Sequence, residues 1–344
     1  MTTEILNTHT PELFRAAVTR AAELLRAGEI VALPTETVYG LAANAFDAKA
    51  VAKIYEAKGR PSHNPIIVHV ADRELARRCV STWPDVATRL ADSFWPGPLT
   101  MVLPRGPEIP GIVTAGGETV GVRWPGHPFI QAVIRECGFP LAAPSANLSN
   151  SISPTNPAHV EKQLKGKIPL IVDGGQSQVG IESTVIDLTC KPPAVLRPGM
   201  IHDESLIAVT GDLVGSKSMK LGGALRSPGQ LKKHYAPKAR LVVLGWRTDA
   251  ELRETLADTG TRRVDNLAHT HVITHTHIPS AAGFASVSVI PHDAEAYARA
   301  IYAELHRCDE AGAELIVVES LPETPAWRAL ADRLGRASAG VGTL

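Results

Sequence analysis

The sequence predicts an α/β protein with two domains: an N-terminal twisted, mixed sheet with flanking helices, and a smaller C-terminal α/β domain. Three observations support this prediction. The length of 344 residues suggests two domains of ordinary size, or one large one. Short apolar runs bounded by Pro and Gly are mixed with amphipathic stretches, but without strict βαβ alternation. The composition also changes near residue 210, where Gly, Ser and Lys replace the apolar periodicity.

The N-terminal region carries clear helix and strand signals. Residues 10–29 are expected to form a helix, with Thr10 as N-cap, a proline at the first position and Gly28 at the stop. Residues 47–59 form a second candidate helix with an aspartate cap. Further strands are expected in "IVALPT", "PIIVHV", "LTMVLP", "TVGVRWP", "PLAAPSA", "PLIVDGG" and "STVIDLT", and further helices in "PDVATRLADSFWPG" and "HPFIQAVIREC".

The change in composition sets the expected domain boundaries. We expect a first domain over residues 1–209, a linker or lid over 210–240 and a small α/β domain over 241–344. In the last of these, strands are expected in "LVVLG" and "AELIVVES", and helices in "AYARAIYAELHRCDE" and "PAWRALADRLGRAS".

The bulk composition argues against several classes of protein. Lys plus Arg and Asp plus Glu both number 35, so no global basic field favours nucleic acid or an anionic membrane as the main ligand. The four cysteines lie far apart, without a C-x-x-C pair, as is typical of reduced thiols. Because the chain also shows neither a signal peptide nor an apolar run of about 18–20 residues, we expect a cytoplasmic protein.

Cations and hydroxyls gather in loops at the predicted strand ends. "AKGRPSHNP" (57–65) holds Lys58 and Arg60 in a stiff loop where both can point at one anion, although exposed cations are often merely solvated. "PTETVYGL" (34–41) by itself indicates a capped turn into the next helix. Further donors stand in "VGVRWPGHP" with Arg123, "AAPSANLSNSISPT" with Ser145, Asn147 and Ser153, "GIESTV" with Ser183, and "VLRPG" with Arg197.

Familiar catalytic signatures are missing from the sequence. "GDLVGSKS" (211–218) imitates a phosphate loop but has Ser216 in place of the second glycine, and no G-x-G-x-x-G follows a strand. No Ser-His-Asp or Cys-His constellation and no metal cage is evident either. The loops together favour a site that holds a polyanion with oriented donors and acts by positioning and charge stabilisation. ATP-dependent adenylyl or phosphoryl transfer fits this pattern, whereas a covalent hydrolase does not.

At this point the motifs carry a family resemblance. "PTETVYGL", "KGRPSHNP", "FWPGPLT", "VRWPGHP", "APSANLS", "DGG" with "ESTVIDLT", "LRPG" and "SPGQLKKHYAP" resemble the YrdC-type threonylcarbamoyl-AMP synthases in their long, two-domain form. The resemblance covers about residues 15–240 and implies a YrdC-like catalytic domain followed by a Rossmann-like one. It also implies an enzyme that makes threonylcarbamoyl-AMP and pyrophosphate from L-threonine, bicarbonate and ATP, the first step of tRNA threonylcarbamoyladenosine (t6A) modification.

The resemblance assigns roles to individual residues. Lys58 and Arg60 fall on the catalytic K-x-R motif. The implied ATP side comprises Lys58, Arg60, Ser62, Ala143, Ser145, Asn147, Ser153, Arg197 and Tyr235, the implied threonine side comprises Thr35, His69, Gly121 and Ser183, and the implied lid carries His234 and Tyr235. Mg²⁺ is expected on the phosphates of ATP, with no protein metal site. Separate transfer proteins are the expected partners, without stable tRNA binding or membrane contact.

Several alternatives stay open at the level of sequence. Related carbamoyl-adenylate chemistry occurs in hydrogenase maturation proteins, and an RNA-binding module is a rival from another class, although zero net charge weighs against it. Asn150 stands where the family commonly has Gly, so that loop is open to a different shape. "LAHTHVITHTH" (267–277) contains His269, His271, His275 and His277, whose spacing favours the polar face of a strand over a metal site.

Overall fold

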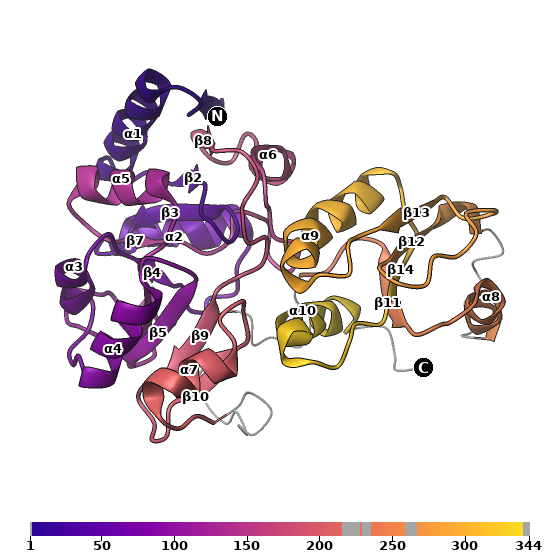
Figure 1. Ribbon diagram of the computed structural model, residues 1–344. Helices are drawn as coiled ribbons and strands as arrows, with labels where there is room; N and C mark the ends of the chain where they lie inside the picture. The colour runs from indigo at the N-terminus through magenta and orange to yellow at the C-terminus, as the bar shows by residue number, and fades with distance from the viewer. Residues whose placement is uncertain (1, 215–227, 229–234, 259–266, 340–344) are drawn as a thin grey trace. The chain divides into compact units, whose positions relative to one another are not determined.

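The computed structural model describes residues 2–214, 228, 235–258 and 267–339 (Figure 1). The chain divides into two compact units. The first comprises Met1–Ser149 and Ser153–Gln230, and the second comprises Asn150–Ile152 and Leu231–Leu344. Because part of the expected linker lies outside the described residues, the boundaries at 210 and 240 stay predictions.

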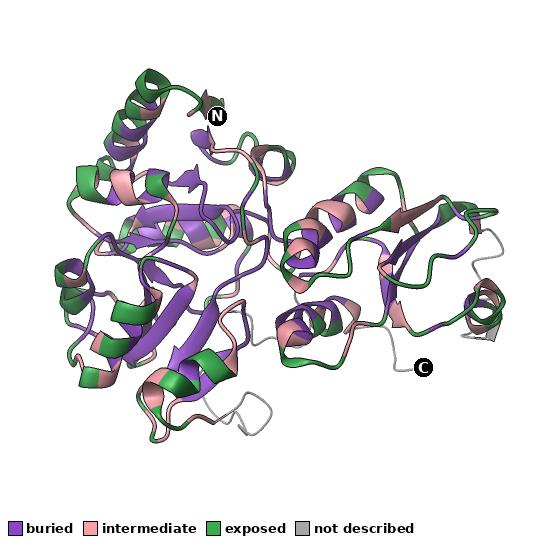
Figure 2. Cartoon of the chain, viewed as in Figure 1, coloured by how far each residue is buried: buried purple, intermediate pink, exposed green. Residues whose placement is uncertain are grey.

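The first unit is built on one mixed sheet with the strand order β1-β8-β2-β3-β7-β4-β6-β5-β9-β10. Its strands are β1 (Glu4–Asn7), β2 (Val31–Leu33), β3 (Gly40–Asn44), β4 (Val68–His69), β5 (Leu99–Pro104), β6 (Thr119–Arg123), β7 (Leu141–Ala142), β8 (Leu170–Asp173), β9 (Thr184–Asp187) and β10 (Ala194–Arg197). Most of their residues are buried, as Figure 2 shows in purple. Both parallel and antiparallel pairs occur, so the predicted mixed sheet is confirmed.

Helices flank this sheet and bury their apolar faces against it and against each other. They are α1 (Pro11–Arg26), α2 (Ala48–Lys58), α3 (Arg73–Arg78), α4 (Asp85–Phe94), α5 (Pro128–Cys137), α6 (Pro157–Leu164) and α7 (Asp203–Thr210). The rings of Phe14 and Phe129 join α1 to α5 at a centroid distance of 5.1 Å. The part of the chain that the structure describes contains no helix long and apolar enough to cross a membrane.

Local signals fixed the first two helices as predicted. The side chain of Thr10 accepts the N–H of Leu13 at the start of α1, and Gly28 takes a positive φ of 74° just beyond its end. Asp47 caps α2 in the same way, and Gly59 closes that helix in the left-handed conformation with a φ of 58°. These caps position the end of α2, where the expected catalytic cations lie.

The interpretation of "PTETVYGL" as a turn directly into a helix is wrong. Strand β3 follows the turn and separates it from α2. Its sequence "GLAAN" consists mainly of small residues, which lack the β-branched or aromatic signature of a strand. The buried neighbours β2 and β7 hold it extended through their ladders. Tertiary pairing therefore overrides a weak local preference.

The second unit is a four-stranded sheet in the order β11-β14-β12-β13, with every pair parallel. Its elements are β11 (Arg240–Leu244), α8 (Asp249–Asp258), η2 (Leu267–His269), β12 (Thr270–Thr274), β13 (Ser286–Val289), α9 (Ala294–Glu310), β14 (Leu315–Glu319), η3 (Pro325–Trp327) and α10 (Arg328–Ser338). This arrangement confirms the expected Rossmann-like α/β domain.

The histidine-rich segment does not form the polar strand face that its spacing favours. All five residues of β12 are buried, because β12 lies between β14 and β13. The His271 side chain is 4% exposed, and its Nδ1 lies 2.7 Å from Ser286 Oγ. His269 precedes the strand, whereas His275 and His277 follow it. The alternating pattern is therefore divided between the short helix η2, the buried strand β12 and the loop that follows it.

Candidate active site

Lys58 ends α2 with its side chain buried against the loop that follows β7. Its Nζ donates to the carbonyl oxygens of Ser145 at 2.6 Å and Asn147 at 2.5 Å, and lies 3.2 Å from Asn147 Oδ1. Burial and then the charge of Arg60 lower the pKa of Lys58, but three oxygen acceptors match the three donors of an ammonium group. Lys58 thus holds in place the loop that carries Ser145 and Asn147.

Arg60 is enclosed by its own loop. The left-handed turn at Gly59 reverses the chain, and Arg60 then donates from Nε to the Asn64 carbonyl at 3.1 Å and from Nη2 to the Pro65 carbonyl at 2.6 Å. Its side chain is buried, as is that of Lys58. Both cations therefore lie inside the protein and are not merely solvated. The Pro-rich stretch provides the stiffness that the sequence predicts.

The loop around Ser145 meets the loop that begins at Thr35. Ser145 Oγ donates to Asn147 Oδ1 at 2.5 Å, and Ser145 forms an isolated bridge with Gly40 at the start of β3. A Cβ at Gly40 would lie 3.3 Å from the Cβ of Ala143 and 4.0 Å from Thr35 Cγ2. The missing side chain of Gly40 therefore allows the two loops to approach closely.

A buried ion pair behind Thr35 was not predicted. Sequence reasoning noted Arg123 but did not connect it with Glu36, whose Oε1 lies 2.7 Å from Arg123 Nη2. Burial alone would raise the pKa of Glu36, but the charge of Arg123 and further hydrogen bonds lower it, so the carboxylate is ionised. Arg123 Nη1 also donates to Thr37 Oγ1 at 2.9 Å, which in turn lies 2.9 Å from Thr35 Oγ1. The feature of the sequence that pointed to this ion pair is the glutamate between two threonines in "PTETVYGL".

His69 lies directly beside Arg123 in the paired strands β4 and β6. It is 3% exposed, and its Nδ1 has no hydrogen-bond partner among the residues that the structure describes. Burial and then the charge of Arg123 lower the pKa of His69 to about 3, so the ring is neutral near pH 7. A buried unpaired nitrogen is costly in free energy, and a bound polar group would satisfy it.

Arg197 and Ser183 form a second cluster of donors. Arg197 donates from Nη2 to Ser183 Oγ and from Nε to the Ser183 carbonyl, both at 3.0 Å. Ser183 Oγ also lies 2.8 Å from Thr100 Oγ1. Ser153, another predicted residue, donates to Glu182 Oε1 at 2.6 Å, a partner that the sequence did not identify. All five side chains are buried or nearly so.

Most of the predicted residues lie on or next to strands of the first unit's sheet. In sheet order, they are Thr35 before β3, Ala143 and Ser145 after β7, His69 on β4, Gly121 on β6, Ser183 before β9 and Arg197 on β10. A Cβ at Gly121 would lie 3.2 Å from Thr100 Cγ2, so the glycine keeps β6 close to the threonine on β5. The arrangement provides fixed cations, hydroxyls and one neutral imidazole, which suits binding of an anion beside a small polar molecule.

The roles of three further residues, Ser62, Tyr235 and His234, stay predictions. Ser62 is exposed in the turn after Arg60. Tyr235 is buried in the second unit, stacked on Tyr302 at a centroid distance of 6.1 Å and under the guanidinium of Arg333. His234 and most of the expected lid lie outside the described residues.

Comparison with known proteins identifies the family. A family model described as "Telomere recombination", which covers Sua5, YciO and YrdC proteins, matches residues 23–199. A second model, described as the C-terminal domain of threonylcarbamoyl-AMP synthase, matches residues 201–339. The threonylcarbamoyl-AMP synthase of Bacillus subtilis is 41% identical over 98% of this chain and 96% of its own length. This chain belongs to the threonylcarbamoyl-AMP synthase family, in its two-domain form.

Two further members of the synthase family are similar to this chain. The crystal structure of P. abyssi Sua5 in complex with L-threonine aligns with a TM-score of 0.87 and 38% identity, covering 98% of each chain. A putative threonylcarbamoyl-AMP synthase from Mycobacterium tuberculosis is 36% identical and covers 61% of this chain but 96% of its own length. The predicted resemblance is therefore confirmed, and the match of the second model favours this family over hydrogenase maturation proteins.

Proposed function

We propose that this chain catalyses ATP-dependent synthesis of threonylcarbamoyl-AMP from L-threonine and bicarbonate, with release of pyrophosphate. The observation that carries the proposal is the rim of the first unit's sheet. There, buried Lys58 and Arg60 lie beside the loop of Ser145 and Asn147, which Lys58 itself holds. Membership of the synthase family supports the same reaction.

The threonine side of the site comprises Thr35, His69, Gly121 and Ser183. Neutral His69 offers an unpaired nitrogen to a polar group of the amino acid, while Glu36 balances the charge of Arg123 nearby. The amine of threonine combines with bicarbonate to give a carbamate and water. Because this arrangement supplies hydrogen bonds without bulk water, it also protects the labile carbamate.

The ATP side provides charge for the transfer itself. A carbamate oxygen attacks the α-phosphorus, the bond to pyrophosphate breaks, and negative charge grows on the non-bridging oxygens. Lys58 and Arg60 are already fixed by carbonyl partners, so they stabilise that charge without large reorganisation. Ser145, Asn147, Ser153 and Arg197 orient the nucleotide, while a cover that includes Tyr235 and His234 stays the expectation from the sequence.

Mg²⁺ enters the proposal only as the partner of ATP, where it neutralises charge on the phosphates. The carboxylates of Glu36 and Glu182 are engaged by Arg123 and Ser153, so neither acts as a dedicated metal ligand. Phosphate oxygens and water then provide most of the ligands.

Omission of each substrate in turn tests the reaction. The purified chain is incubated with ATP, L-threonine and bicarbonate, and both pyrophosphate and the mass of threonylcarbamoyl-AMP are measured. We expect product only when all three are present. Pyrophosphate released without threonine or bicarbonate would contradict the proposal.

The product then passes to separate transfer proteins that modify tRNA, in the expected cytoplasmic setting, and stable tRNA binding by this chain is not required. The equal numbers of acidic and basic residues support this view. A titration of tRNA binding against salt provides the check. Tight binding with a steep loss of affinity as salt rises would favour the RNA-binding alternative instead.

A further inference from the structure

A second polar site lies in the other unit, at the carboxyl edge of its parallel sheet. Strands β11, β14 and β12 end side by side there and continue into Gly245, Ser320 and His275. An open pocket of about 440 Å³ occupies this edge, and Trp246, Arg247 and three histidines are among the residues that line it. The carboxyl edge of such a sheet is where α/β proteins commonly bind ligands.

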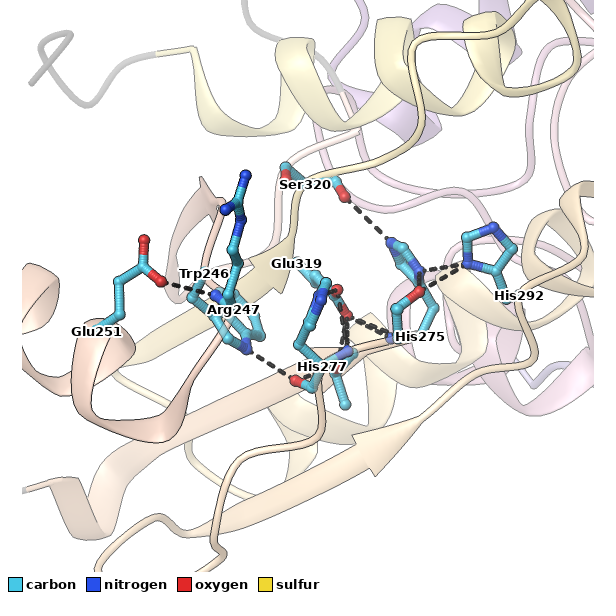
Figure 3. A network of polar contacts seen from close by, with 10 residues as sticks. Trp246, Arg247, Glu251, His275, His277, His292, Glu319 and Ser320 are labelled. Carbon is cyan, nitrogen blue, oxygen red and sulfur yellow. Dashed lines mark hydrogen bonds and ion pairs between the residues drawn. The ribbon is translucent and has the colours of Figure 1, made fainter.

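Glu319 makes the loop at this edge rigid. Its carboxylate accepts the backbone N–H groups of His275 at 2.7 Å, Thr276 at 3.0 Å and His277 at 3.1 Å, and it also accepts the hydroxyl of Thr274 (Figure 3). Burial alone would raise the pKa of Glu319, but these hydrogen bonds lower it to about 2. The backbone of this loop is therefore held in place by the carboxylate of Glu319.

The hydrogen bonds also determine the tautomer of neutral His275. Its Nε2 lies 3.1 Å from the carbonyl oxygen of Ser320, which can only accept, so Nε2 carries the proton. Its Nδ1 is then left with a lone pair. A ring nitrogen that donates to a backbone carbonyl while the other presents its lone pair is the arrangement found in metal-binding histidines.

Two further atoms that can bind a metal ion lie close to that nitrogen. His275 Nδ1 lies 2.9 Å from His292 Nδ1 and 2.8 Å from Thr276 Oγ1, and these two atoms are themselves 2.8 Å apart (Figure 3). For a cation about 2.1 Å from each atom, such separations correspond to bond angles of roughly 84–87°. That is the facial geometry of a site that keeps open positions for water or a ligand.

Aromatic side chains partly cover the triangle formed by these three atoms on the side that faces the pocket. The rings of His275 and His292 pack against Trp327 at centroid distances of 5.6 and 5.3 Å, and His275 also meets the edge of Tyr297. His275 and His292 both line the pocket as well. The histidines are thus supported by aromatic side chains and remain accessible to a small ion.

We propose that His275, His292 and Thr276 form a binding site for one divalent transition-metal ion such as Zn²⁺, Ni²⁺ or Co²⁺. Imidazole nitrogen favours these ions over Mg²⁺ and Ca²⁺, which prefer oxygen ligands. The bound ion ties the end of β12 to the segment between β13 and α9. The site differs from the four-histidine cluster considered from sequence, because His271 bonds to Ser286 and the Nδ1 of His277 bonds to Glu319.

Calorimetric titration of the chelator-treated full chain with ZnCl₂ tests this site. We expect one equivalent to bind to the wild type, and the variants His275→Ala and His292→Ala each to bind at least about tenfold more weakly, because even second-shell changes cost 10–100-fold. His269→Ala is the matched control, since it removes an exposed histidine of the same segment. ZnCl₂ at a concentration that just saturates the wild type should also raise its unfolding temperature by more than that of His292→Ala.

His292 is exposed, so its replacement provides a readout that does not depend on the packing around His275. Circular dichroism of both variants confirms folding before titration. The proposal is overturned if His292→Ala binds Zn²⁺ as tightly as the wild type, if His269→Ala loses as much affinity, or if the wild type binds no Zn²⁺. It does not depend on the synthase activity of the first unit.

Discussion

Lys58 and Arg60 are enclosed by protein, and their carbonyl partners determine where their charge lies. Two oxygens of the Ser145 and Asn147 backbone hold the ammonium group, and two carbonyls of the next loop hold the guanidinium. Removing a buried cation therefore removes its charge and also frees the loop that the cation holds. Both changes lower the reaction rate, and the freed loop also lowers the free energy of unfolding.

Lys58→Ala is expected to reduce pyrophosphate release by at least about 10²–10³-fold, the usual loss when a charge-stabilising donor is removed. Lys49→Ala, an exposed position on the same helix, is the matched control and should retain near-normal rates. Steady-state kinetics with all three substrates provide the measurement. Turnover of Lys58→Ala within a fewfold of Lys49→Ala would reject the assigned role.

His69 makes a prediction about pH. Its pKa is about 3 in the folded chain and near 6.5 when unfolded, so below pH 6.5 the unfolded state binds a proton that the folded state does not. Its contribution to stability is thus fully present above pH 6.5 and falls toward pH 3, by up to about 1.4 kcal/mol per pH unit. Between pH 6.5 and 4, the free energy of unfolding of the wild type should therefore depend on pH more steeply than that of His69→Gln. Denaturant titrations at each pH provide the measurement. Parallel curves would contradict a neutral buried ring.

At the scale of elements, the features set by local sequence could be predicted, whereas the pairing of strands could not. The caps at Thr10 and Asp47 and the stop at Gly28 are written within a few residues, so α1 and α2 could be predicted. The Arg123–Thr37 contact joins residues 86 apart, and the burial of β12 depends on strand order, so neither follows from local pattern. Asn150 takes a φ of 67°, a left-handed conformation that Asn tolerates and Gly adopts freely. Asn150 can therefore replace the Gly of the family without a different backbone conformation in that loop.

The turn after β10 provides a test of how elements support the site. A Cβ at Gly199 would lie 2.3 Å from the backbone nitrogen of Thr184, so Gly199→Ala must push the end of β10 away from β9. Arg197 and Ser183 would then lose their alignment. We expect a loss of about 3 kcal/mol in unfolding free energy together with weaker ATP binding.

Gly111→Ala is the control for this substitution. No heavy atom lies within 4 Å of a Cβ built at that position of the same unit, so a change within about 0.5 kcal/mol is expected. Denaturant unfolding of both variants gives the comparison. Equal stabilities would show that β10 and β9 need not approach so closely.

At the scale of the whole molecule, the first unit carries almost the complete expected site. Thr35, His69, Gly121 and Ser183 all belong to it, and so do Lys58 and Arg60, whereas Tyr235 belongs to the second unit. The shorter relative from Mycobacterium tuberculosis matches 61% of this chain over 96% of its own length. The second unit contains Tyr235, whose role in a cover stays a prediction, and a polar edge of its own.

A chain truncated after Val214 tests this division. We expect it to unfold cooperatively and to bind L-threonine within about tenfold of the full chain, because its threonine-side residues all remain. Pyrophosphate release should fall further than binding does, since Tyr235 is gone. Calorimetry and thermal unfolding provide both measurements. Loss of threonine binding from a folded truncated chain would place part of that site elsewhere.

A crystal structure of the full chain with L-threonine and a non-hydrolysable ATP analogue bound decides whether the rim of the first unit holds both substrates at once. We expect phosphate oxygens within hydrogen-bond distance of Lys58 or Arg60, and the amino acid beside His69 and Ser183. Either ligand bound away from these side chains, with the rim empty, would contradict the proposed enzyme site.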